Sequence, residues 1–237
     1  LVVFEAGAAG LTRLGAVRWQ PVPIGGVYED ATALLGFGQG GEGKLMGLAG
    51  YGTVDPTAVG AILRRSGEWT VQSELLSAPD HPLREHLRAP WAPLRRPEHE
   101  VFAANVQAAL EQTVLPFIAD AVAATGISDI CLAGGVALNC SLNGAVAAQP
   151  WAGRVHVPPS PADPGNAAGS ALLWAARAGA SRPSPLYDGG LGVAYDAAGW
   201  LERLRGDGRF DCEVVGDAAS AAVSQRAAAD IAEGRII

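Results

Sequence analysis

Two adjacent glycines, Gly134 and Gly135, stand between an apolar segment and a helix-like segment, an arrangement that can bind a phosphate or a nucleoside. The stretch reads Leu132-Ala-Gly-Gly-Val-Ala-Leu-Asn139. Glycine has no Cβ, so a ligand can approach its backbone closely and φ can be positive. A helix that begins at Val136 would offer free N–H groups and a positive dipole end, with Asn139 one turn along facing the same ligand. An ordinary strand–turn–helix connection explains the stretch equally well by itself.

Asp163 is a second candidate, in the stretch Pro158-Pro-Ser-Pro-Ala-Asp-Pro-Gly-Asn166. Pro164 is suited to the first position of a helix, which would place Asp163 at the N-cap. Capping alone is worth about 1 kcal/mol and is the more common explanation for such a residue. The alternative is a carboxylate that binds a metal ion beside phosphate groups.

The glycine-rich stretch Gly38-Gln-Gly-Gly-Glu-Gly-Lys-Leu45 fits the GxGxxG pattern of dinucleotide sites and the GxxxxGK pattern of P-loops. A P-loop needs Ser or Thr after its lysine to hold magnesium, and Leu45 occupies that position. Both motifs also follow a strand, whereas the residues before these glycines indicate a helix. We therefore expect either a flexible loop or a helix. The helix would begin with Glu42 and Lys44 and continue through residues 47–49.

The elements that must position these candidates alternate between strands and helices. The clearest is a helix over residues 97–125, where Phe102, Val106, Leu110 and Phe117 recur at helical spacing. Further helices are expected at 27–37, 136–148, 164–178, 196–204 and 218–233, and strands at 1–5, 10–19, 129–133, 154–157 and 211–215. Residues 55–96 are expected to have little regular structure. The alternation predicts an α/β fold class.

Composition excludes several classes of function. The 237 residues are 49% hydrophobic, which is enough for a sizeable core, and the net charge of −7 argues against binding a nucleic-acid backbone. No apolar stretch has the roughly 18 to 20 residues needed to cross a bilayer, and we expect neither a signal peptide nor a membrane partner.

Cysteine and histidine spacing gives no metal or disulfide pattern. Three cysteines without a CxxC pair fit no closed disulfide framework, so a reducing cytoplasm is the expected compartment. Two histidines on one helical face would need a spacing of four, which none of these has, so we interpret all four as structural or surface residues. They are His81, His86, His99 and His156.

Three stretches taken together resemble the O-carbamoyltransferases of nodulation-factor and antibiotic biosynthesis. Residues 41–52 look like the family's GEGKxMGLAxYG element, residues 132–143 like LAGGVALNCxxN, and residues 163–172 like its D-x-G-x-A-x-G-A-A-L element. Residues 100–111, with Gln107 and Glu111, are similar to the helix before the Gly-Gly turn. The resemblance covers about residues 25 to 178, and three ordered motifs are far more specific than any one.

The resemblance implies a fold of the actin/Hsp70/sugar-kinase (ASKHA) type, incomplete here, over residues 1–181. A linker would follow at 182–190, and residues 191–237 would begin a second α/β domain that makes carbamoyl-adenylate from carbamoyl phosphate and ATP. The first domain would then transfer the carbamoyl group to a hydroxyl of a small-molecule acceptor, such as a sugar or another natural product. Related possibilities are a tRNA threonylcarbamoyl transferase, a sugar kinase, or a non-catalytic nucleotide-binding module.

The resemblance also assigns residues. The adenylate and carbamoyl group would be held by Glu42, Lys44, Gly134, Gly135, Val136, Asn139, Gly165 and Asn166, and a divalent metal, Fe or Mg, by Asp163. The family's metal site also uses a His-x-x-x-His pair upstream of these motifs. The sequence starts without Met and ends in a strand-like Arg235-Ile-Ile237, so we interpret it as a fragment and expect it to be inactive alone. Catalytic residues, the acceptor and the oligomeric state are not predicted.

Overall fold

The computed structural model describes residues 1–7, 10–16, 18–20, 23–67, 70–72, 97–180, 193, 196–215 and 220–235. The chain forms two compact units, Leu1–Tyr187 and Asp188–Ile237. The predicted linker at 182–190 lies outside the described residues, and the identities proposed for the two domains stay predictions. None of the helices in the described ranges combines the length and apolar character needed to span a membrane.

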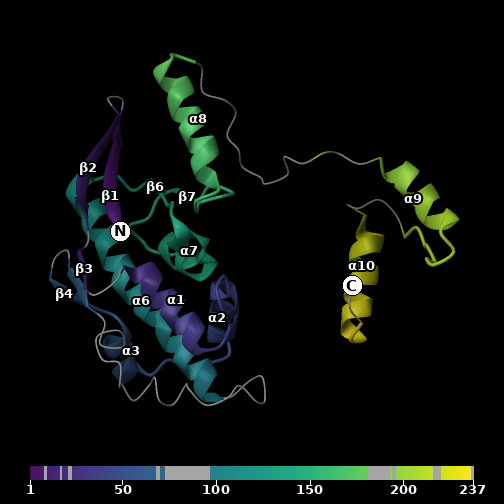
Figure 1. Ribbon diagram of the computed structural model, residues 1–237, viewed down its shortest axis with the longest axis horizontal. Helices are drawn as coiled ribbons and strands as arrows, with labels where there is room; N and C mark the ends of the chain where they lie inside the picture. The colour runs from purple at the N-terminus through teal and green to yellow at the C-terminus, as the bar shows by residue number, and fades with distance from the viewer. Residues whose placement is uncertain are drawn as a thin grey trace. The chain divides into compact units, whose positions relative to one another are not determined.

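Helix α6, Pro97–Thr125, is the central element of the first unit and has the predicted bounds (Figure 1). Pro97 begins it, and the negative charges of Glu98 and Glu100 in the first turn interact favourably with the positive end of the helix dipole. Gly126 ends it with φ of 69° and donates its N–H to the carbonyl of Val122. Its buried side chains face several neighbours, so α6 is a core helix rather than a surface one.

Three shorter helices pack on α6: α1 (Ile24–Leu34), α2 (Glu42–Ala49) and α3 (Pro56–Ile62) (Figure 1). Their apolar side chains and those of α6 and α7 form one core. The backbone after α2 approaches α6 so closely that a Cβ on Gly52 would fall on the Glu100 carbonyl. The closeness of that contact therefore depends on the absence of a side chain at Gly52.

The structure corrects two expectations in this region. The glycine-rich stretch forms a helix from Glu42, which is the second of the alternatives above, and not a flexible loop. The expectation of little regular structure over 55–96 is wrong for its first part: residues 56–62 form α3, and residues 64–67 and 70–72 form strands. Asp55 caps α3 by accepting a hydrogen bond from the Thr57 N–H at 2.9 Å. Most of the remaining stretch, 73–96, lies outside the described residues.

The strands form small sheets. β1 (Val2–Gly7) and β2 (Gly10–Ala16) make an antiparallel hairpin with Val2 opposite Ala16. β3 (Arg18–Gln20) is a separate strand, parallel to β5 (Thr70–Gln72), which pairs antiparallel with β4 (Arg64–Gly67). The strand predicted at 10–19 is therefore two strands in different sheets.

The C-terminal part of the first unit carries the Gly-Gly turn. β6 (Ile130–Cys131) pairs in parallel with β7 (Val155–His156), and between them lie the 3₁₀ turn η1 (Gly135–Leu138) and helix α7 (Cys140–Ala147). Helix α8 (Gly165–Arg177) follows β7. The expectation of one continuous helix over 136–148 is wrong, since Asn139 adopts an extended conformation (φ −76°, ψ 97°) between η1 and α7.

The second unit contains α9 (Ala197–Gly206) and α10 (Ala221–Ala232). Asp196 and Ser220 cap them by accepting hydrogen bonds from the N–H groups of Ala198 and Val223. The predicted strand at 211–215 is wrong, because these residues pair with no other described segment and a strand needs a partner for its backbone groups.

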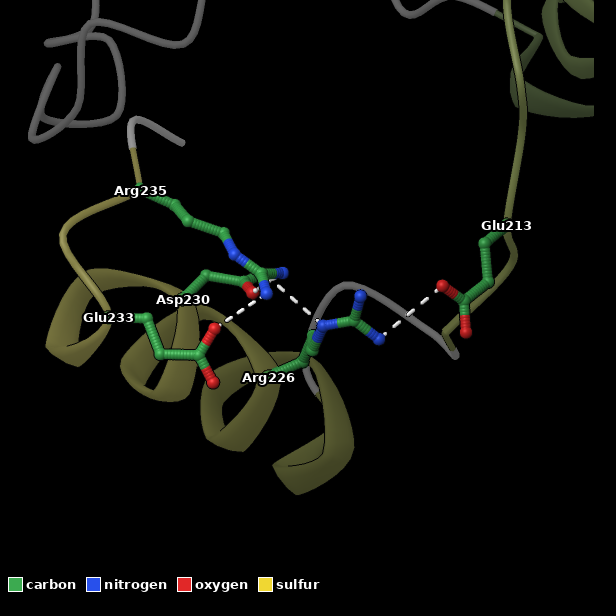
Figure 2. A network of polar contacts seen from close by, with 5 residues as sticks. All are labelled: Glu213, Arg226, Asp230, Glu233 and Arg235. Atoms are coloured by element: carbon green, nitrogen blue, oxygen red, sulfur yellow. Dashed lines mark hydrogen bonds and ion pairs between the residues drawn. The ribbon is translucent and has the colours of Figure 1, made fainter.

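Charged side chains form ion pairs along α10 and with the residues on either side of it (Figure 2). Arg226 contacts Asp230 one turn along at 3.2 Å and Glu213 before the helix at 3.3 Å. Arg235, just beyond the helix, contacts Asp230 at 2.9 Å and Glu233 at 2.5 Å. Most of these side chains are solvent-exposed, so the ion pairs should contribute little to the free energy of unfolding.

Candidate functional site

A buried amide pair joins α6 to the segment after the Gly-Gly turn. The Asn139 Nδ2 donates to Gln107 Oε1 at 2.8 Å, and Gln107 Nε2 donates to Asn139 Oδ1 at 3.1 Å. The Tyr28 hydroxyl of α1 donates to the same Gln107 Oε1 at 2.9 Å. Buried polar groups are costly unless paired, so this reciprocal arrangement fixes the relative positions of α1, α6 and the start of α7.

Asn139 also sets where α7 begins. Its Oδ1 accepts a hydrogen bond from the Leu142 N–H at 2.8 Å, which is an N-cap interaction. Asn143 donates its amide to the Ala137 carbonyl at 2.8 Å and holds η1 against α7. Asn139 is 9% exposed, and its side chain stabilises the local fold at the place where the sequence predicts a ligand contact.

Carboxylates lie next to this amide pair. Gln107 Nε2 donates to Glu111 Oε1 at 2.7 Å, one turn further along α6. Burial raises the pKa of Tyr28 above its usual range; the Asn139 amide opposes this, and the charges of Glu111 and Glu42 add to the rise. Glu42, a predicted site residue, therefore acts electrostatically on the Tyr28 hydroxyl.

Helix α2 reaches the same region. The Cys140 thiol at the start of α7 contacts the Met46 sulfur at 3.7 Å. Glu42 is half-buried at the first position of α2, whereas Lys44 is exposed. The motif segments 41–52 and 132–143 are thus adjacent in space, although the contacting residues are 94 positions apart in the sequence.

A pocket of about 250 Å³ opens between α2, α6 and the start of α7. Its walls include Gln107 and Glu111 of α6, Met46 of α2 and Ser141 of α7. The pocket is therefore adjacent to the amide pair, and its wall combines apolar surface with a carboxylate, an amide and a hydroxyl.

The Gly-Gly turn has the predicted backbone freedom. Gly134 has φ of 98°, a conformation that favours glycine. A Cβ on Gly135 would meet nothing within 4 Å, so this residue faces open space. Because η1 is a single short turn and α7 starts only at Cys140, the predicted long-helix dipole does not begin at the glycines.

The turn is joined to the segment that carries Asp163. The Gly134 N–H donates to the Pro161 carbonyl at 2.7 Å, two residues before Asp163. The motif segments 132–143 and 163–172 are therefore neighbours in space. Val136 lies beside α1, because a Cβ on Gly25 would meet its side chain at 3.8 Å.

The surroundings of Asp163 differ from expectation. Pro164, and not Asp163, is the N-cap of α8, and no side chain caps the helix, so the predicted capping role is wrong. The Asn166 N–H donates to the Asp163 main-chain carbonyl at 3.0 Å, and Asp163 is exposed. Gly165 is half-buried and Asn166 exposed.

The described residues do not form a complete metal site. Within the described ranges, no three His, Cys, Asp or Glu side chains gather where they could hold an ion. Asp163 as a single metal ligand stays a prediction, and no reaction step below is assigned to a metal.

Gln107 and Glu111 belong to the segment that resembles the family, but no role was predicted for them, and Tyr28 is not among the predicted site residues. The available signal was their position, because Gln107 and Glu111 are one turn apart on α6. A buried Tyr on α1 opposite them could not be paired with Gln107 before the helices were packed.

Comparisons with known proteins agree with the motifs. The family described as Carbamoyltransferase N-terminus matches residues 8–172. Nodulation protein NolNO of Sinorhizobium fredii is 30% identical over 223 residues, covering 90% of this chain and 32% of the relative. Nodulation protein NolO of Bradyrhizobium diazoefficiens is 32% identical over 210 residues, covering 84% of this chain and 37% of the relative.

An uncharacterized protein of Synechocystis sp. is 31% identical over 179 residues, covering 65% of this chain and 28% of the relative. The chain thus spans about a third of the length of the relatives it matches. The family match extends over more than half of the chain and includes all three motif segments. On this basis, the chain belongs to the carbamoyltransferase family, in the part described as its N-terminus.

Proposed function

We propose that this chain is part of the carbamoyl-transfer domain of an ATP-dependent O-carbamoyltransferase with an actin/Hsp70/sugar-kinase-like fold. The enzyme would move a carbamoyl group from carbamoyl phosphate, by way of carbamoyl-adenylate, to a hydroxyl of a sugar or another natural product. Family membership supports the class of reaction. The contact that most supports a nucleotide site is the Gly134–Pro161 hydrogen bond, which joins two motif segments.

In the transfer step, the acceptor oxygen attacks the carbamoyl carbon and a new C–O bond forms. The bond between that carbon and the phosphate oxygen of AMP breaks, AMP leaves with the electron pair, and the hydroxyl proton passes to a base. AMP is a good leaving group because carbamoyl-adenylate is a mixed anhydride. The protein must therefore position the acceptor and stabilise charge on the carbonyl and phosphate oxygens.

In this proposal the open backbone at Gly134, Gly135 and Val136 receives the adenylate. Gly165 and Asn166 lie on the segment that Gly134 contacts, and the charge of Glu42 acts on Tyr28, which shares the Gln107 side chain with Asn139. Lys44 is exposed on α2, where its ammonium group could contact a phosphate. Asn139 would act by holding the amide pair and α7 in place more than by contacting the ligand.

The test is a bulky side chain at Gly135 in the full-length protein. A Cβ there meets nothing within 4 Å and φ is ordinary, so we expect Gly135→Val to leave the fold intact. The affinity for a non-hydrolysable carbamoyl-adenylate analogue, measured by calorimetric titration, should fall at least tenfold, about 1.4 kcal/mol, because the side chain would occupy the ligand's position.

Gly144→Val is the matched control, since Gly144 is exposed on α7 and also has nothing within 4 Å of a Cβ. It should bind the analogue as the unaltered protein does. Unchanged affinity for the analogue in Gly135→Val, with an unchanged melting temperature, would remove the Gly-Gly turn from the site.

A further inference from the structure

The pocket between α2, α6 and the start of α7 has a composition that the nucleotide site does not explain. Apolar groups of Met46, Val54 and Ala108 form one part of its wall, and Gln107, Glu111 and Ser141 supply polar atoms. A cavity that is mostly apolar with a few convergent polar groups is typical of a small-molecule site. Its volume of about 250 Å³ is sufficient for one ring or branch of a ligand.

The pocket lies directly beside the predicted transfer site. Gln107 donates one hydrogen bond to Glu111 and another to Asn139, so two hydrogen bonds connect the pocket carboxylate to the LAGGVALN segment. Ser141, on the pocket wall, is two residues after Asn139. A molecule in the pocket would therefore lie close to the segment where the adenylate is proposed to bind.

Gln107 also limits how Glu111 can move. Its Nε2 holds Glu111 Oε1 at 2.7 Å, while its Oε1 is occupied by Tyr28 and Asn139. One carboxylate oxygen is thus fixed, and the other can accept a hydrogen bond from a ligand. Positioning a carboxylate in this way is what a general base requires.

From this arrangement we propose that the pocket binds the acceptor and that Glu111 accepts the proton of the acceptor hydroxyl during carbamoyl transfer. This assignment rests on the proposed function. The hydroxyl oxygen bonds to the carbamoyl carbon, its proton moves to Glu111, and AMP leaves with the electron pair of the broken C–O bond.

The charge of the pocket indicates the class of acceptor. Among the described residues that line it, Glu111 is the one with an ionisable carboxyl or amine. An acceptor that is neutral or positively charged near its reactive hydroxyl is therefore favoured, and one with an adjacent acidic group is repelled.

The experiment measures two steps separately in the full-length protein. Adenylate formation is followed as pyrophosphate release that depends on carbamoyl phosphate, and transfer as AMP release with glucosamine, or with water when no sugar is present. Glu111→Gln keeps an oxygen that can accept from Gln107 but cannot take the proton. We expect AMP release to fall on the order of 100-fold or more in both cases, a typical general-base contribution, with pyrophosphate release unchanged.

A second variant tests the pocket itself. Ala108→Phe should fill the cavity, so the KM for glucosamine should rise at least about tenfold while adenylate formation is retained. Glu98→Gln and Ala123→Phe, on exposed positions of the same helix, are controls that should behave as the unaltered protein.

The outcomes separate the two proposals. Normal pyrophosphate release together with unaltered AMP release in both pocket variants overturns the acceptor assignment and leaves the proposed function standing. Failure of the unaltered protein to form carbamoyl-adenylate overturns the proposed function and this assignment with it.

Discussion

The surroundings of Asn139 and those of Asp163 differ sharply, although both residues lie in a strand–turn–helix segment. Around Asn139, side chains from α1, α6 and α7 enclose a buried amide pair. Helix α8 after Asp163 has no buried residue, and its Trp174 is 73% exposed. Two motifs of similar form can thus be supported by very different amounts of packing.

This difference in packing distinguishes a buried polar pair, held by the protein's own contacts, from an exposed side chain without such support. The amide pair is held by the protein's own contacts and is organised before any ligand binds, which lowers the entropy cost of catalysis. The Asp163 carboxylate is exposed, and its orientation is not set by the helix that follows it. We therefore expect substitutions in the first region to affect the fold and those in the second to leave it unchanged.

The largest expected effect is at the core of α6. Phe117 is fully buried, and Phe117→Ala should lower the free energy of unfolding by about 3 to 5 kcal/mol through lost apolar contact and the cavity left behind. Urea denaturation measures this. Trp174→Ala is the matched test on α8 and should change stability by less than about 0.5 kcal/mol; a loss comparable to that of Phe117→Ala would contradict the contrast between the regions.

The amide pair comes next. Gln107→Leu keeps the side-chain size but leaves the buried polar groups of Tyr28 and Asn139 without their partner, at a cost of about 2 to 3 kcal/mol. Gln112→Leu, exposed on the same helix, should be nearly neutral. Equal unfolding midpoints for the two variants would show that the pair does not hold the helices together.

The smallest effect concerns pH. Because the pKa of Tyr28 is raised in the folded protein, the unfolded state loses this proton first as pH increases. The stability from the neutral hydroxyl is fully present below about pH 10, the unfolded pKa, and declines above it by up to about 1.4 kcal/mol per pH unit. Urea denaturation between pH 8 and 11 tests this. In the Tyr28→Phe protein, the decrease in the free energy of unfolding above about pH 10 should be smaller, because this hydroxyl is absent.

Much of the helical framework could be predicted because its signals are local. Pro97 and Gly126 mark the ends of α6, and Asp196 caps α9 as its position before the helix indicates. The errors arose where local signals compete. The single helix predicted over 136–148 did not take account of Asn139, a residue type favoured at N-caps, whose side chain accepts a hydrogen bond from the Leu142 N–H where η1 ends and α7 begins.

Residue identity and spacing along the chain are sufficient to indicate the family, the order of the motifs and the residue types available for chemistry. The packing of the helices was needed to show that Tyr28, Gln107 and Asn139 form one buried cluster and that Glu111 lines a pocket beside it. Contacts between residues 79 or 32 positions apart depend on how the helices pack, and side-chain pairing across helices leaves no periodic signal in the sequence.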